Sequence, residues 1–83
     1  MHRVILPKSV QKQLDRLPAE VVERILARLA ALESNPRPND VKKLNGRTGW
    51  RVRLGDYRVI YEIRDRELQI LVITVGHRRE IYR

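Results

Sequence analysis

The sequence predicts an α+β fold, in which two N-terminal antiparallel helices pack on a small, mostly antiparallel four-stranded sheet. Three observations lead to this prediction. Apolar residues recur with a period of 3.6 in the first half of the chain. Alternating and continuous apolar runs follow in the second half. A Gly-Asp pair between two of these runs is typical of a tight hairpin turn.

A single domain over residues 1–83 is expected, because the length suits one compact core and no repeat or linker is present. The absence of cysteine excludes disulfides and thiolate metal sites. His2 and His77 are too far apart in sequence to form a zinc pattern, so we expect no metal and no other cofactor. No apolar run reaches the ~18 residues of a membrane span, and the start does not resemble a signal peptide. We therefore expect a soluble cytoplasmic protein with no membrane partner.

The first elements are predicted to be a strand and two helices. Arg3–Leu6 is a short apolar run that ends at a proline, and we interpret it as a strand. Apolar residues at helical spacing predict a helix between the prolines at 7 and 18. A second helix is expected to begin there and to end at residues 34–36. Its apolar stripe consists of Val22, Ile25, Leu26, Leu29 and Leu32.

The second half is predicted to contain three strands. Residues 34–46 are rich in proline and asparagine, which favours a loop. The stretch WRVRLGDYRVIY (50–61) predicts a hairpin with Gly55-Asp56 as a type II′ turn. The apolar run 68–75 predicts a last strand covered on both faces. Gly76 is expected to end that strand, with no helix after it, so that the order is β-α-α-β-β-β.

Closing the hairpin at Gly55-Asp56 pairs Arg53 with Arg58 and places Arg51 on the same sheet face. Like charges opposite one another destabilise a strand pair, so structure alone does not explain this arrangement. We interpret the face as a phosphate site. On the last strand, residues 70 and 72 are expected to lie beneath the helices, and residues 71 and 73 to line the arginine side.

The net charge of +8 is concentrated in the half of the chain that contains the hairpin. Residues 42–83 carry eleven basic and five acidic side chains, against seven and five in residues 1–41. Such a surface favours polyanions, most often nucleic acid. The alternative is a basic surface that keeps the protein soluble or docks an acidic partner. Lys42, Lys43 and Arg47 are expected either to be solvated or to contact an RNA or DNA backbone.

The chain ends with a basic segment, HRREIYR (77–83). A glycine directly before it lets the backbone turn, so that Arg78 is expected to reach the arginine side of the hairpin. The alternative is a frayed basic terminus.

Two segments, WRVRLGDYRVIYEI and VGHRREIY, resemble the RelE toxins of the RelE/ParE superfamily, and the resemblance extends over the whole chain in element order. GDYRVIY marks the superfamily fold, and the two segments together resemble the branch that cleaves mRNA in the ribosomal A site. The resemblance implies a RelE-like type II toxin that is a ribosome-dependent, metal-independent endoribonuclease. It also implies three partners: mRNA, the ribosome and a cognate antitoxin.

Carried over by position, the resemblance assigns five catalytic residues: Arg51, Arg53, Arg58, Arg78 and Tyr82. Five further basic or ring-bearing residues are assigned to substrate binding: Lys42, Lys43, Arg47, His77 and Arg79. The best-known enteric branch has lysines where Arg51 and Arg53 stand. Because arginine stays charged, this pair is expected to hold the scissile phosphate and not to remove a proton.

The implied reaction is attack of the RNA 2′-hydroxyl on the adjacent phosphate. Arg58 and Arg53 are expected to bind the phosphate, and Arg78 to stabilise the transition state or the leaving group. Tyr82 is assigned to base stacking or proton exchange. His77 is the less favoured base, because strand alternation directs it away from Arg78. Two rivals stay open, a ParE-like non-nucleolytic inhibitor of DNA gyrase and a plain nucleic-acid or antitoxin-binding module.

Overall fold

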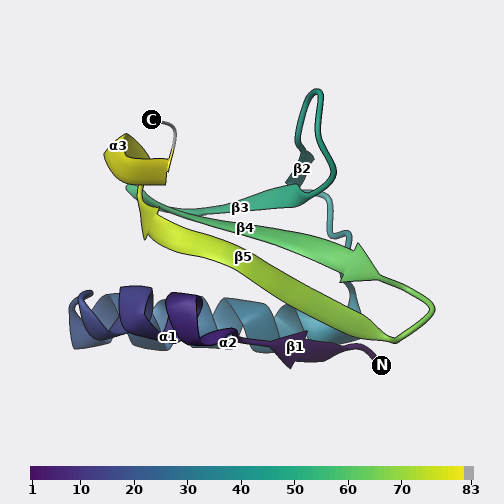
Figure 1. The fold of residues 1–83 in the computed structure, drawn as a ribbon, viewed down its shortest axis with the longest axis horizontal. Helices are drawn as coiled ribbons and strands as arrows, with labels where there is room; N and C mark the ends of the chain where they lie inside the picture. The colour runs from purple at the N-terminus through teal and green to yellow at the C-terminus, as the bar shows by residue number, and fades with distance from the viewer. Residues whose placement is uncertain (82–83) are drawn as a thin grey trace.

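The computed structural model describes residues 1–81, in which two helices cover one face of a five-stranded sheet (Figure 1). The first three elements are β1 (Arg3–Ile5), α1 (Lys8–Asp15) and α2 (Ala19–Ser34). The others are β2 (Lys42–Lys43), β3 (Trp50–Leu54), β4 (Tyr57–Arg64), β5 (Gln69–His77) and α3 (Arg78–Ile81). The sheet order is β1-β5-β4-β3-β2, and only the β1–β5 pair is parallel. The α+β prediction is confirmed.

Both long helices begin directly after a proline, Pro7 for α1 and Pro18 for α2. Proline has a fixed φ that suits the start of a helix, and its missing N–H is not needed there. The helix α2 ends where Asn35 becomes extended, because a residue that precedes a proline is disfavoured in the helical conformation. In Figure 1, α1 runs away from β1 and α2 returns beneath the sheet, which is the predicted antiparallel pair.

The core lies between these helices and the inner face of the sheet. Its fully buried members come from α1, α2, β3, β4 and β5, and include Val10, Ile25, Leu32, Val52, Val59, Tyr61, Ile70 and Val72. One residue of the apolar stripe predicted for α2 is not buried in this core. Leu26 is 42% exposed, because the sheet covers only the part of the helical stripe around Ile25, Leu29 and Leu32. No helix within residues 1–81 is long and apolar enough to cross a membrane.

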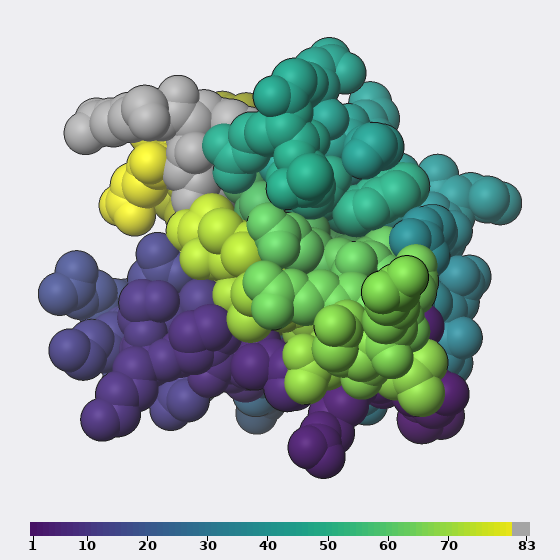
Figure 2. Space-filling model, turned by 45° about the vertical axis from the view of Figure 1, so that its right-hand side comes forward, coloured from purple at the N-terminus to yellow at the C-terminus, as the bar shows by residue number. Residues whose placement is uncertain are grey.

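A short strand, β2, lies in the segment that was predicted to be a loop. Lys42 pairs with Arg51 and Lys43 with Trp50, so β2 extends the sheet beyond β3. Backbone N–H and C=O groups along the edge of β3 need partners, and these two lysines supply them. The connection from β2 to β3, teal in Figures 1 and 2, rises above β3 on the side away from α1 and α2 in Figure 1.

The strand β5 contains an extra residue that reverses the alternation of its side chains. Tyr61 pairs with Val72 and Ile60 with Thr74, so Ile73 has no counterpart on β4. Such a bulge moves every later side chain to the other face. Val75 and His77 therefore face the helices, and Gly76 lies on the opposite face, across from Arg58.

Both ends of β5 differ from the prediction. Leu68 lies in the preceding turn with a φ of 53° and is not part of the strand. Gly76 does not end the strand, because its pairing with Arg58 and the pairing of His77 with Tyr57 continue the ladder. A helical turn, α3, then follows, where no terminal helix was expected.

Gln13 of α1 holds the edge of β5 near the bulge. Its Nε2 donates to Thr74 Oγ1 at 3.0 Å, and its Oε1 accepts from Val75 N at 2.9 Å. The pairing with β1 ends at Leu71, so the backbone N–H of Val75 lies beyond the reach of that strand. A side chain from the helical layer thus takes the place of a neighbouring strand.

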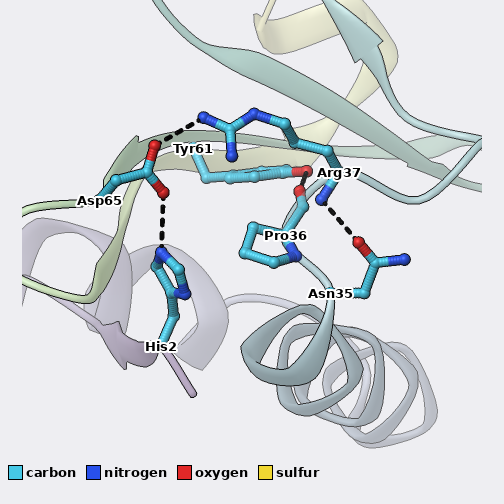
Figure 3. Close-up of polar contacts among 6 residues, drawn as sticks. All are labelled: His2, Asn35, Pro36, Arg37, Tyr61 and Asp65. Atoms are coloured by element: carbon cyan, nitrogen blue, oxygen red, sulfur yellow. Dashed lines mark hydrogen bonds and ion pairs between the residues drawn. The ribbon is translucent and has the colours of Figure 1, made fainter.

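Polar contacts fasten three distant segments at the other end of the sheet (Figure 3). The Tyr61 hydroxyl donates to Pro36 O at 2.9 Å. Arg37 Nη2 donates to Asp65 Oδ2 at 2.9 Å, and His2 Nε2 lies 3.0 Å from Asp65 Oδ1. The hydrogen bond from Arg37, and then that of His2, holds the pKa of Asp65 below its ordinary value. The N-terminus, the α2–β2 loop and the β4–β5 turn are thereby tied together.

We expect Gly49→Ala to destabilise the protein more than Gly46→Ala. Gly49 has a φ of 126°, and a Cβ built there lies 3.2 Å from Leu44 Cδ1 and 3.4 Å from Tyr61 O. Gly46 has a φ of 72° with nothing within 4 Å of such a Cβ. The expected losses in free energy of unfolding are roughly 2–3 kcal/mol and about 1 kcal/mol, respectively. Urea denaturation measures both, and equal losses would contradict the steric account.

We expect Tyr61 to make the folded state sensitive to alkali. Burial raises the pKa of its phenol from 10.0 to about 12, although Arg28 and Arg37 act in the opposite direction. The folded state thus holds this proton more tightly than the unfolded state does. The resulting stability is complete below pH 10 and is lost as the pH rises from about 10 to 12. Urea midpoints across this range should fall less steeply for Tyr61→Phe, and parallel curves would refute the assignment.

Candidate functional site

A basic surface, which we call the arginine face, lies on the side of the sheet opposite α1 and α2. It consists of Lys42 on β2, Arg51 and Arg53 on β3, and Arg58 on β4. All five strand pairs predicted for this hairpin are present: Leu54–Tyr57, Arg53–Arg58, Val52–Val59, Arg51–Ile60 and Trp50–Tyr61. The prediction that three arginines share one face is therefore confirmed.

The turn that closes this hairpin depends on Gly55. Its φ of 62° agrees with the predicted type II′ turn, whose first central residue has a positive φ. Asp56 follows with a negative φ, as that turn type requires of its second central residue. The short turn places two backbone carbonyls close to the start of β4.

Arg58 is the most enclosed cation of this face, with only 5% of its surface exposed. Its Nη1 donates to Gly55 O at 2.8 Å and to Tyr57 O at 3.0 Å. Its Nε is buried and has no hydrogen-bond partner within residues 1–81. Buried donors are rarely left without partners, because desolvation costs about 1–3 kcal/mol for each. An anion at this position would satisfy both the donor and the charge.

A second part of the arginine face is a hollow of about 160 Å³ lined by Asp40, Lys42, Arg51 and Arg53. Asp40 is engaged by Arg28 of α2 in an ion pair. Arg53 is exposed, whereas Arg51 is half-buried. Three cations thus line a concave surface that continues from Arg58 toward β2, which suits a chain of phosphates.

The helix α3 brings Arg78 to the hairpin turn. Arg78 N donates to Asp56 O at 2.8 Å, and Arg78 Nε lies 3.9 Å from Asp56 Oδ1. The structure therefore places Arg78 at the same turn that binds Arg58, whereas the sequence predicted only that Arg78 reaches the arginine side of the hairpin. Asp56 itself was missed, because an aspartate in a tight turn is explained by the turn alone. The sequence feature that could have indicated Asp56 is its position, as a carboxylate directly before Tyr57-Arg58 in a basic segment.

Of the other residues assigned from the sequence, His77 is not on the arginine face. His77 faces the helix side, where its ring lies edge-to-face with Tyr57 at 5.6 Å, and its Nδ1 accepts from Arg79 N at 3.2 Å. Arg79 is exposed on α3, and Arg47 is exposed in the β2–β3 connection. Tyr82 lies outside the described residues.

Lys43 lies at the opposite end of the sheet from α3, in a cluster that the sequence did not indicate. Its Nζ is 5.7 Å from the centroid of the Trp50 ring, and Arg37 Cζ is 5.6 Å from it. These cation–π contacts account for Lys43 without a nucleic acid. Within the described part of the chain, no three His, Asp or Glu side chains are grouped so as to hold a metal ion.

Comparison with known proteins relates this arrangement to one family. Residues 4–82 match the family model described as the ParE toxin of type II toxin-antitoxin system, parDE. A search of the curated proteins found no significant match.

Solved structures of RelE toxins share the fold. The RelE–RelB complex from Pyrococcus horikoshii OT3 is 36% identical with a TM-score of 0.83, over 95% of this chain and 97% of that one. The isolated Escherichia coli RelE toxin is 25% identical with a TM-score of 0.82, over 99% and 92%. The RelB–RelE complex from Methanococcus jannaschii is 26% identical with a TM-score of 0.75, over 99% and 95%. The chain therefore belongs to the RelE/ParE superfamily of type II toxin–antitoxin systems, as a toxin of the RelE type.

Proposed function

We propose that this toxin is a ribosome-dependent endoribonuclease that cleaves mRNA in the A site and thereby inhibits translation. The observation that supports it most is Arg58, a guanidinium that is 5% exposed and has a buried Nε with no hydrogen-bond partner among residues 1–81. It lies across the strand pair from Arg53 and beside the turn that binds Arg78. A phosphodiester placed there would meet several fixed positive charges.

In the proposed reaction the RNA 2′-oxygen bonds to the adjacent phosphorus, and the bond from phosphorus to the 5′-oxygen breaks. The 2′-hydroxyl gives its proton to a base, and the leaving 5′-oxygen takes one from an acid. The products are a 2′,3′-cyclic phosphate and a 5′-hydroxyl. Arg58 and Arg53 stabilise the negative charge of the pentacoordinate phosphate, and Arg78 acts on the phosphate or the leaving oxygen.

The arginine face offers few side chains that could act as the acid or the base of this reaction. The four cations of the arginine face are lysine or arginine, and His77 faces the helix side. Tyr82 is the candidate that the resemblance to RelE toxins assigns to this step. This scarcity of acids and bases supports dependence on the ribosome, which would align the 2′-hydroxyl and the phosphate for in-line attack.

A cognate antitoxin is the second proposed partner. The toxins from Pyrococcus horikoshii and Methanococcus jannaschii were solved as complexes with RelB. The charge of +8 favours an acidic partner. An apolar groove between β1 and α2, lined by Val4, Leu6, Leu26, Leu29, Ala30 and Glu33, would accept its apolar side chains. We propose that the antitoxin covers the arginine face and so prevents RNA from binding.

Inhibition of DNA gyrase, as by a ParE-like toxin, is the alternative function. A gyrase inhibitor does not need Arg58 and Arg78 at the same turn. Toxicity that survives Arg58→Ala together with Arg78→Ala would therefore support this alternative over the ribonuclease.

We expect Arg53→Ala to reduce the salt dependence of RNA binding. Each phosphate contact to single-stranded RNA contributes about 0.7 to the slope of log K against log[salt]. Loss of one contact should therefore reduce the slope by about 0.7. Fluorescence anisotropy with a short single-stranded RNA at several salt concentrations measures it. The matched control is Arg66→Ala, an exposed arginine in the β4–β5 turn, which should keep the wild-type slope.

We expect primer extension on an mRNA translated in a purified system to show new stops inside codons with the wild-type toxin. Arg58→Ala should reduce cleavage by roughly 100-fold or more, as loss of a fixed transition-state donor does. Arg66→Ala should cleave like the wild type. Tyr82→Phe separates the two roles of that residue, because the ring can still stack whereas the hydroxyl is gone.

Absence of stops at concentrations that arrest growth would refute the ribonuclease proposal. A supercoiling assay with purified gyrase is then the next measurement, and inhibition that is unchanged in Arg58→Ala would establish the alternative function.

A further inference from the structure

The turn at Gly55-Asp56 contacts both arginines that we propose to act on the phosphate. Gly55 O accepts a hydrogen bond from Arg58 Nη1 at 2.8 Å. Asp56 O accepts one from Arg78 N at 2.8 Å. The Asp56 side chain adds an ion pair, with Oδ1 3.9 Å from Arg78 Nε. The acidic side chain of Asp56 thus lies beside the proposed phosphate site, where its negative charge by itself would weaken RNA binding.

The contact between Arg78 Nε and Asp56 Oδ1 at 3.9 Å is an ion pair beyond hydrogen-bond distance. Attraction of the Nε side of the guanidinium toward the turn favours one direction for its terminal donors, which suit the oxygens of a phosphate. We propose that Asp56 is a positioning residue, which orients Arg78 toward the phosphate bound by Arg58. This inference rests on the proposed ribonuclease function.

The ion pair between Asp56 and Arg78 adds little to folding stability. The side chains of Arg78 and Asp56 are 53% and 66% exposed, and exposed ion pairs contribute little to stability. The backbone hydrogen bond from Arg78 N to Asp56 O already ties the start of α3 to the turn, whatever side chain residue 56 carries.

If Asp56 only repelled RNA at long range, its substitution would change the cleavage rate in the opposite direction to that expected of a positioning residue. If Asp56 acted only through its negative charge, its removal would strengthen RNA binding and speed cleavage. If it orients Arg78, removal slows cleavage, while RNA binding is unchanged or strengthened. The direction of the rate change therefore separates the two roles.

The test is a double-mutant cycle with wild type, Asp56→Asn, Arg78→Ala and the double variant. Single-turnover cleavage of mRNA on programmed ribosomes gives the maximal rate and the half-saturating toxin concentration for each. Asparagine keeps the turn, because Gly-Asn suits a type II′ hairpin. Glu67→Gln makes the same change of charge at an exposed residue of the β4–β5 turn, and is the control.

We expect Asp56→Asn to lower the maximal rate about tenfold, which is within the cost of a misplaced catalytic group. The half-saturating concentration should stay equal or fall. In the Arg78→Ala background, Asp56→Asn should cause no further loss, because its effect is transmitted through Arg78. Glu67→Gln should keep the wild-type rate.

A tenfold loss that persists without Arg78, or a faster rate in Asp56→Asn, would overturn the inference. So would an unchanged rate in Asp56→Asn beside active wild-type toxin, and that result would leave the ribonuclease function intact. No cleavage by the wild type would overturn both.

Discussion

The burial of the Arg58 guanidinium is the constraint on which the candidate site depends. An arginine cannot lose its charge to ease desolvation, so carbonyls must be supplied for it locally. The tight turn does this through Gly55 O and Tyr57 O, and a type II′ turn in turn requires a glycine at its first central position. The face around Arg58 must also stay clear of the helices. The helical layer accordingly packs on the other side of the sheet.

The bulge in β5 connects the fold to this site. If β5 were a regular strand with Ile73 paired in the ladder, strict alternation from Val72 would direct His77 to the side of Arg58 and Gly76 to the helices. With the bulge, a residue without a side chain lies across from the buried guanidinium, and the chain enters α3 with Arg78 beside the turn. Gln13 reaches from α1 to hold this stretch of β5, so the helical layer stabilises the geometry of a face that it does not cover.

The two ends of the sheet differ in how their charged side chains are arranged. At the end near α3, cations lie close together and the buried Nε of Arg58 has no partner in the described part of the chain, which reduces stability and favours an anion. At the opposite end, charges are paired or stacked: Asp65 binds Arg37 and His2, and Trp50 contacts two cations. The cluster of Figure 3 therefore fastens the chain at a distance from the proposed chemistry.

Local pattern in the sequence determined α1, α2, the β3–β4 hairpin and its arginine face, because each depends on residues that are near neighbours in the chain. The register of that hairpin follows from alternation and a turn of two residues, and both can be counted in the sequence. Only the tertiary structure decided the strand β2, the bulge, the continuation of β5 through Gly76 and the contact between Asp56 and Arg78. These features form because backbone groups and charges far apart in sequence meet only after the sheet has assembled.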